Sequence, residues 1–220
     1  MITNTKVFFK FLLLMLLLFL SRKSFSQVND YDQNAYKTVF INTQEWMSEN
    51  LKVEHFRNGD PIPQVQNPAE WANLKTPAWC YYDNDSANNS VYGKLYNWYA
   101  VNDPRGLAPE GWRVAADADW ITLVNHCGCG ELAGGKLKAL TYWNEPNTGA
   151  YDEYGFSALP GGYRYTNGMF SYLGKFGCFW TSTVSKDDNA WYRYLDYIQT
   201  NVFRYDESKV TGMSVRCLKE

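Results

Sequence analysis

The stretch Tyr163-Arg164-Tyr165-Thr166-Asn167-Gly168-Met169-Phe170-Ser171-Tyr172 decides the fold class of this chain. Aromatic residues flank an Asn-Gly dipeptide, which favours a tight turn between two antiparallel strands. The stretch therefore predicts a β-hairpin. The sequence after it is rich in β-branched and aromatic residues, which predicts further strands at 179–183, 191–198, 202–205 and 211–218.

The part of the chain before the hairpin predicts short helices and a first pair of strands. Residues 37–41 are typical of a strand that turns at Asn42-Thr43 and returns. Asn67-Pro68-Ala69-Glu70 begins a helix, with Asn as the cap and Pro at the first helical position. Residues 117–126 place apolar side chains on one helical face. The predicted fold class is α+β, with a twisted antiparallel sheet, short flanking helices and a long loop-rich region.

Composition is that of an ordinary globular protein with one unusual feature. The 220 residues are 45% hydrophobic and carry a formal net charge of −2, which disfavours nucleic acid as a partner. Aromatic residues make up 17% of the chain, enough to fill a β core or to line a binding surface. Only two histidines are present, His55 and His126, which excludes a His-rich metal site.

The first 26 residues predict a secretory signal peptide. Lys6 and Lys10 accompany an apolar run at 11–20, and Ser24-Phe25-Ser26 provides the small-x-small pattern of a cleavage site. A transmembrane anchor is the alternative. The apolar stretch is shorter than the roughly 20 residues of a span, whereas Arg22-Lys23 after it could hold such a segment in place. We therefore expect export to the periplasm, the cell surface or the medium, with no stable transmembrane span after cleavage.

Cleavage leaves an acidic chain. Residues 1–26 carry four basic residues and no acid, so their removal shifts the net charge from −2 to −6. Such a protein is a poor ligand for nucleic acid or anionic membranes. Residues 27–36 are polar and predict a loose leader, and 37–220 predict a single domain without an internal linker. The pattern makes no prediction of oligomeric state.

Five cysteines suit an exported protein with disulfides. The number is odd, so at least one thiol is left over, and we expect one or two structural bridges of unspecified connectivity. The Cys-Gly-Cys stretch is neither a redox nor a zinc motif. The cysteines are Cys80, Cys127, Cys129, Cys178 and Cys217.

Several phrases carry a resemblance to a known family. They include TQEWMSENL at 43–51, YGKLYNWYAV at 92–101 and GFSALPGGYR at 155–164. Further phrases lie at 107–114, 190–193 and 214–217. Together they resemble the Fibrobacter succinogenes major paralogous domain, over about residues 37–219. That family has no established activity. The chain lacks the lipoprotein cysteine of many members, and Ala115-Ala116 replaces the usual Pro-Thr, so Asp117 is expected to cap the helix instead.

The same phrases are similar to a wider group. Gly111-Trp112-Arg113-Val114, a late Gly-Gly pair and a terminal Val-Arg strand resemble the C-type-lectin-like and formylglycine-generating-enzyme fold. The resemblance implies a small twisted antiparallel sheet with flanking helices and a long loop-rich insertion. Enzymes of the formylglycine-generating group use a cysteine pair. Cys178 and Cys217 are the candidates by location, although no matching motif surrounds them.

Two loops contain candidate ligands for calcium or a sugar. Asp83 and Asp85 belong to an Asn/Asp-rich loop whose oxygens suit calcium, although a solvated turn is the simpler interpretation. Glu145-Pro146-Asn147 resembles the triplet with which mannose-type lectins hold calcium and sugar hydroxyls, and Asp152 could add a ligand. The alternative is an ordinary turn. Calcium is the one cofactor that the sequence suggests.

The strand at 191–198 supplies further candidate ligand contacts. Alternation separates an odd set containing Trp191 from an even set containing Tyr192 and Tyr194. Exposed Trp and Tyr rings stack on sugars or protein partners, but the same residues can be cross-strand pairs that stabilise the sheet. We expect most of the late aromatic residues to be structural and a few to meet a ligand.

The sequence therefore predicts an exported, non-catalytic binding or adhesion domain for a glycan or a cell-surface protein. No Ser-His-Asp or Cys-His motif surrounds either histidine. Two alternatives stay open: an uncharacterised or degenerate enzyme of the formylglycine-generating type, and a structural component of the cell envelope.

Overall fold

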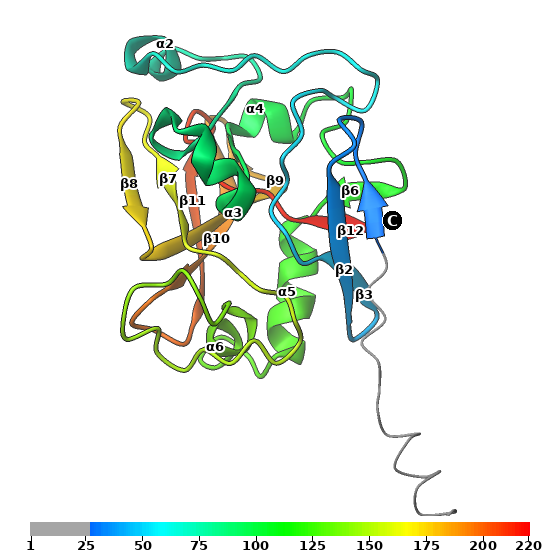
Figure 1. Ribbon diagram of the computed structural model, residues 1–220, viewed down its shortest axis with the longest axis vertical. Coiled ribbons are helices and arrows are strands. Elements are labelled where there is room, and N and C mark those ends of the chain that lie inside the picture. Colours follow the sequence, from blue (N-terminus) through cyan, green and yellow to red (C-terminus); the bar gives the residue numbers. More distant parts are fainter. Residues whose placement is uncertain (1–26) are drawn as a thin grey trace, which may run out of the picture.

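Two five-stranded sheets form the frame of the protein (Figure 1). The computed structural model describes residues 27–220, so the predicted signal peptide at 1–26 lies outside the described residues. Both sheets are curled and almost wholly antiparallel, and a few short helices flank them. The α+β class is thereby confirmed.

The first sheet joins both ends of the described chain. Its strand order is β1-β2-β3-β12-β6, so the last strand inserts beside the first hairpin. The predicted strand at 37–41 and its return are confirmed as β2 and β3. The bounds are β1 Gln27–Asn29, β2 Ala35–Ile41, β3 Gln44–Met47, β6 Trp112–Val114 and β12 Cys217–Lys219.

The segment 27–36 is not the loose leader that its polar composition predicts. Its first residues form β1, which pairs with β2. Its polar side chains are used inside the turn: the Asp30 carboxylate accepts hydrogen bonds from the Asn34 amide and the Tyr36 hydroxyl. Composition failed here because Asp30, Asp32 and Asn34 have hydrogen-bond partners that only the folded chain supplies.

The second sheet contains the predicted hairpin. Its strand order is β11-β10-β9-β7-β8, with β7 and β8 joined as the Asn-Gly turn predicts. Strands β9, β10 and β11 form a long antiparallel meander, and a parallel pairing connects β7 to β9. The bounds are β7 Gly161–Arg164, β8 Phe170–Leu173, β9 Phe176–Lys186, β10 Asn189–Asp196 and β11 Val202–Ser208.

Short helices and turns connect the two sheets. The Asn67 side chain accepts hydrogen bonds from the backbone N–H groups of Ala69 and Glu70, which confirms the predicted cap. The strand expected at 211–218 shortens to β12, preceded by isolated bridges. The bounds are α2 Pro68–Ala72, β4 Trp79–Cys80, η1 Tyr82–Asn84, η2 Ser86–Asn88, α3 Asn89–Tyr92, β5 Leu95–Tyr96, α4 Trp98–Val101, α5 Asp117–His126 and α6 Ala133–Leu137.

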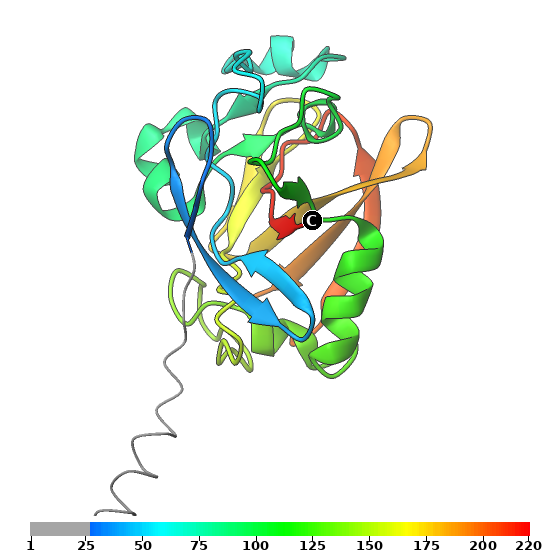
Figure 2. The same ribbon diagram turned by 90° about the vertical axis from the view of Figure 1, so that its right-hand side faces the viewer.

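Helix α5 lies against β9 and β10, as Figure 2 shows. Its N-terminus is not capped by Asp117 as expected. The Asp119 carboxylate accepts the backbone N–H of Ala116 instead, at 2.7 Å. Asp117 is thereby released to form a buried ion pair with Arg193 (2.7 Å) and a second with Arg204 (3.0 Å). The helix is thus fastened to the sheet by charge as well as by apolar packing.

Three buried cations hold the loops between these elements. Lys138 donates to the carbonyl oxygens of Thr148, Asp196 and Gln199, each at 2.9 Å. Arg164 and Arg216 are fully buried and likewise bind mainly backbone carbonyls, at 2.6–3.0 Å. Since an unpaired buried carbonyl is costly, each cation stabilises several loop carbonyls at once.

Within residues 27–220, none of the helices combines the length and the apolar character needed to cross a membrane.

Candidate functional site

The second sheet has two unlike faces. Along β10, Arg193 and Leu195 point to the face covered by α5, which we call the closed face. Tyr192 and Tyr194 point to the opposite side, which we call the open face. One end of the open face is buried under the core around Trp180, and the other end is accessible.

An aromatic pocket occupies the accessible end of the open face. Its volume is about 210 Å³. All its lining residues are aromatic except for one cysteine at its floor: Tyr163, Phe176, Cys178, Tyr192, Tyr194 and Tyr205. We call this set the aromatic pocket.

Strand register brings these rings together. In the antiparallel ladder Tyr192 lies opposite Tyr205, and Tyr194 lies between Cys178 and Phe203. Side chains that oppose one another on one face of a sheet are about 5 Å apart at Cβ, and the Tyr194 ring stacks on those of Phe203 and Tyr205. The pocket is thus built from residues of four strands, β7, β9, β10 and β11, that lie far apart in the sequence.

The rings form a row that continues past the pocket. Tyr172 stacks on Phe176 with a centroid distance of 4.5 Å, and Tyr194 stacks on Phe203 at 4.6 Å. Phe176 and Tyr194 join the two stacks at 5.3 Å. Because neighbouring rings cover each other's faces, the row presents ring edges and hydroxyl groups to solvent.

Three of the pocket tyrosines have hydroxyl pKa values above the ordinary value. Burial is the main cause that raises the pKa of Tyr163, Tyr192 and Tyr194. Neighbouring phenols and carboxylates raise these pKa values further. Each hydroxyl can therefore donate a hydrogen bond and accept one, which suits a ligand rich in hydroxyl groups.

Trp191 was a candidate ligand contact together with Tyr192 and Tyr194, but it does not line the aromatic pocket. As the neighbour of Tyr192 on an extended strand, it points to the closed face. The Arg204 guanidinium lies 3.3 Å from the centre of its ring. Since Arg204 also pairs with Asp117, this ring face is occupied by the protein itself.

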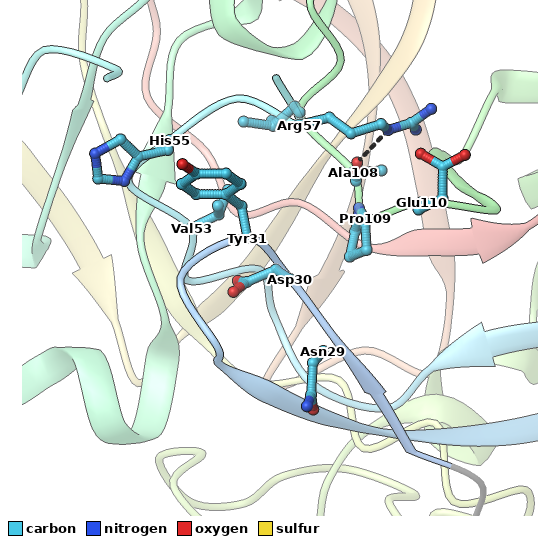
Figure 3. Close-up of a pocket in the computed structure, with 10 residues that line it drawn as sticks. Asn29, Asp30, Tyr31, Val53, His55, Arg57, Ala108, Pro109 and Glu110 are labelled. Carbon is cyan, nitrogen blue, oxygen red and sulfur yellow. Dashed lines mark hydrogen bonds between the residues drawn. The ribbon is translucent and has the colours of Figure 1, made fainter. Parts of the chain in front are cut away.

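A second pocket lies beside the β1–β2 turn (Figure 3). Its volume is about 220 Å³, and Figure 3 shows Tyr31 next to His55 at one end and Arg57 near Ala108 and Pro109 at the other. The pocket is lined by Asn29, Asp30, Tyr31, Val53, His55, Arg57, Leu107, Ala108, Pro109 and Glu110. We call it the N-terminal pocket.

Polar groups of the N-terminal pocket are largely paired within the chain. His55 Nδ1 lies 2.5 Å from Asp32 Oδ1, and Asp32 also accepts the backbone N–H groups of Glu54 and His55. Burial alone would raise the pKa of Asp32, but these hydrogen bonds and His55 hold it below its ordinary value. Arg57 donates to the carbonyls of Ala108 and Trp112. The geometry fastens the turn to the domain.

In the Glu145-Pro146-Asn147 triplet, the side chain of Asn147 is used by the loop itself. The Glu145–Pro146 peptide is cis, and Glu145 is exposed. The Asn147 amide donates to the carbonyl of Ala139 at 3.1 Å, so its donor serves the loop itself. Trp143 just before the triplet is buried and donates to Ala158.

The three aspartates predicted to bind calcium do not form a metal site. Asp83 is exposed, Asp85 accepts the backbone N–H of Ala87, and both oxygens of Asp152 accept hydrogen bonds from Ser157. Within residues 27–220 no three His, Cys, Asp or Glu side chains gather in a way that could hold a metal ion. Asp85 and Asp152 use their carboxylates to stabilise their own turns.

The expected disulfides are absent from the described residues, which include all five cysteines. Cys80, Cys127, Cys178 and Cys217 are each buried among apolar side chains. Burial raises the pKa of the Cys217 thiol to about 12 and that of Cys178 higher still. Thiols in such surroundings stay protonated, whereas metal binding and thiol redox chemistry require the thiolate.

Taken together, the geometry defines an α+β domain of two curled antiparallel sheets with an aromatic pocket on one of them. The family model of the Fibrobacter succinogenes major domain matches residues 39–219, so the chain belongs to this family. The resemblance inferred from the sequence phrases is thereby confirmed. Comparisons with curated proteins and with solved structures found no match.

Sequence reasoning identified Tyr192 and Tyr194 but missed most of their neighbours. Phe176 and Tyr205 were not singled out, because neither belongs to a recognisable motif. One signal could have found Tyr205: β11 alternates Phe203, Tyr205 and Glu207 on one face, in a strand already predicted to pair with 191–198.

Proposed function

We propose that this protein is an exported, non-catalytic carbohydrate-binding domain of C-type-lectin-like fold, and that the aromatic pocket is its binding site. The observation that carries the proposal is a pocket lined by five aromatic side chains, four of which are tyrosines with hydroxyl groups. Sugars offer C–H faces, which pack against exposed aromatic rings such as Tyr205, and hydroxyl groups, which exchange hydrogen bonds with phenol hydroxyls.

Exposure within the pocket and along the row of rings that continues past it supports this choice of site. Tyr205 is 53% exposed and Tyr172 is 39% exposed, while the rings between them are half-buried. Rings that already pack against one another lose little side-chain entropy when a ligand arrives, so their contacts contribute more fully to affinity. A pre-ordered row is the arrangement expected of a binding surface.

Two further observations favour binding over thiol-based catalysis and over calcium dependence. Cys178 lies at the floor of the pocket, but its thiol is held protonated by burial. The described residues 27–220 include no cluster of acidic side chains fit for calcium. We therefore expect sugar binding to need neither a reactive cysteine nor a metal ion.

A glycan array with the purified protein tests the proposal. We expect binding to a defined group of glycans, equal in calcium and in EDTA. Tyr194→Ala and Tyr205→Ala should each weaken it about tenfold, in the range of one lost aromatic contact.

The matched control is Tyr151→Ala. Tyr151 is a tyrosine of the same 53% exposure that lies outside the pocket, and its removal should leave binding unchanged. Binding to a protein ligand alone, or no loss in the pocket variants, would contradict the proposal.

A further inference from the structure

Charge sets the kind of ligand that the aromatic pocket accepts. None of its lining residues carries a formal charge near neutral pH. The ionised groups that act on its tyrosines are carboxylates: Glu207 acts on Tyr192 and Asp196 acts on Tyr194. For Tyr163 the interacting groups are other phenols and the Cys178 thiol.

An anionic ligand would therefore meet repulsion without a compensating cation. A carboxylate or sulfate placed in the pocket would lose water, and the side chains around it offer only neutral donors. The nearby Glu207 and Asp196 would add repulsion of the same sign. A neutral hydroxyl-rich ligand suffers neither cost.

The length of the aromatic row indicates how much of a ligand is held. Tyr172 stacks at one end and Phe203 at the other, and both lie outside the residues that line the pocket. The row crosses from β8 through β9 and β10 to β11. Neighbouring strands are about 4.8 Å apart, so a chain lying across the strands would span several rings.

We propose that the aromatic pocket and the row around it select uncharged polysaccharides and hold a run of several sugars rather than one terminal sugar. This inference rests on the proposed carbohydrate binding and specifies its ligand. Neutral phenols provide the hydrogen bonds, the row provides the length, and the flanking carboxylates exclude acidic chains.

The experiment compares two kinds of polysaccharide with the purified protein. Affinity electrophoresis in gels containing a neutral galactomannan, a neutral glucan, an alginate or a polygalacturonate gives the charge preference. Calorimetry with oligosaccharides of the retarding neutral polymer, from disaccharide to hexasaccharide, gives the length preference. We expect retardation by a neutral polymer alone and an affinity that increases about tenfold or more along the length series.

The variant Glu207→Gln tests directly whether the flanking carboxylates exclude acidic polysaccharides from the aromatic pocket. Glu207 lies on the same face of β11 as Tyr205, and its change removes one negative charge near Tyr192. We expect neutral-chain affinity to be unchanged and retardation by alginate to appear or to increase about threefold at low salt. The increase should vanish at high salt.

The outcomes separate the two proposals. Binding of acidic chains at least as tight as neutral ones, lost in Tyr194→Ala, would overturn the charge preference and leave carbohydrate binding in place. A hexasaccharide no tighter than a disaccharide would overturn the extended site. Absence of retardation by every polymer would refute carbohydrate binding itself.

Discussion

The closed and open faces of the second sheet differ in how they accommodate the polar groups of neighbouring residues on β10. On the closed face Arg193 is only 4% exposed, and the Asp117 carboxylate of α5 neutralises it. On the open face Tyr192 and Tyr194 bury their rings against other rings and leave hydroxyl groups accessible. The closed face pairs its charges within the chain, whereas the open face, as we propose, offers its hydroxyl groups to a ligand. Stability and binding should therefore be separable by mutation.

The largest effect is expected from breaking the closed face at Asp117. Asp117→Ala leaves Arg193 buried without its partner, and we expect the free energy of unfolding to fall by about 3–5 kcal/mol. Urea denaturation of the variant and the wild type measures this difference in the free energy of unfolding. The control is Asp206→Ala, which removes a partly exposed carboxylate paired with Lys186 and should cost about 1 kcal/mol or less. Equal losses in the two variants would show that the closed face does not depend on this charge pair.

A smaller loss is expected at Lys138, which fixes the end of β10 from the closed side. Lys138→Met fills the same volume but leaves the carbonyls of Thr148, Asp196 and Gln199 without their donor. We expect a loss of about 2–3 kcal/mol. Thermal denaturation would follow it, with Lys175→Met, which changes an exposed lysine, as the neutral control. A stable Lys138→Met variant would mean that water replaces the ammonium without cost.

Alkaline pH should distinguish the open face. The folded protein raises the pKa of Tyr192, mainly through burial, so this hydroxyl contributes stability below about pH 10, where the unfolded tyrosine is also protonated. That contribution is lost as pH rises from about 10 toward the folded pKa, because only the unfolded chain releases the proton. Tyr192→Phe lacks this proton. At about pH 11 it should retain about 1 kcal/mol more of its neutral-pH stability than the wild type does.

Urea denaturation at pH 7 and at alkaline pH measures this difference. The two proteins should have similar stability at pH 7. An identical alkaline decline in both would show that Tyr192 titrates in the folded state as it does in the unfolded chain.

The smallest effect on stability is expected at Tyr205. With half of its surface exposed, Tyr205→Ala should change the free energy of unfolding by about 0.5 kcal/mol or less while it weakens glycan binding about tenfold. Calorimetric melting and the glycan array measure the two quantities on one preparation. A large drop in melting temperature would show that the open face also serves as core.

The sequence predicted those parts of the fold in which local pattern and tertiary structure agree. The Asn-Gly hairpin, the helix at 117–126 and the β9–β11 meander follow from turn chemistry and periodicity. The stretch at 27–36 shows the limit. It forms a strand because the edge of β2 is available for pairing. The residues of the stretch itself carry no pattern that predicts this pairing.

Site prediction was limited by the same kind of missing information. Alternation correctly separated Tyr192 from the residues of the closed face, but no local signal placed Arg204 over the ring of Trp191. The hydrogen bonds that Ser157 donates to Asp152 are likewise not visible in composition. Contacts across strands and turns decided the site, and they appear only in the folded chain.

The groups that bind the buried cations determine which parts of the domain should unfold first at low pH. Lys138, Arg164 and Arg216 hold their loops through carbonyl and amide oxygens, which gain no proton at low pH. The Asp32 carboxylate, which accepts the backbone N–H groups of Glu54 and His55, does gain one. Burial alone would raise the pKa of Asp32, but its hydrogen bonds hold it below its ordinary value, so acid should first loosen the β1–β2 turn while the loops around the second sheet stay in place. As the pH of the medium falls, the β1–β2 turn should open before the loops around the second sheet do.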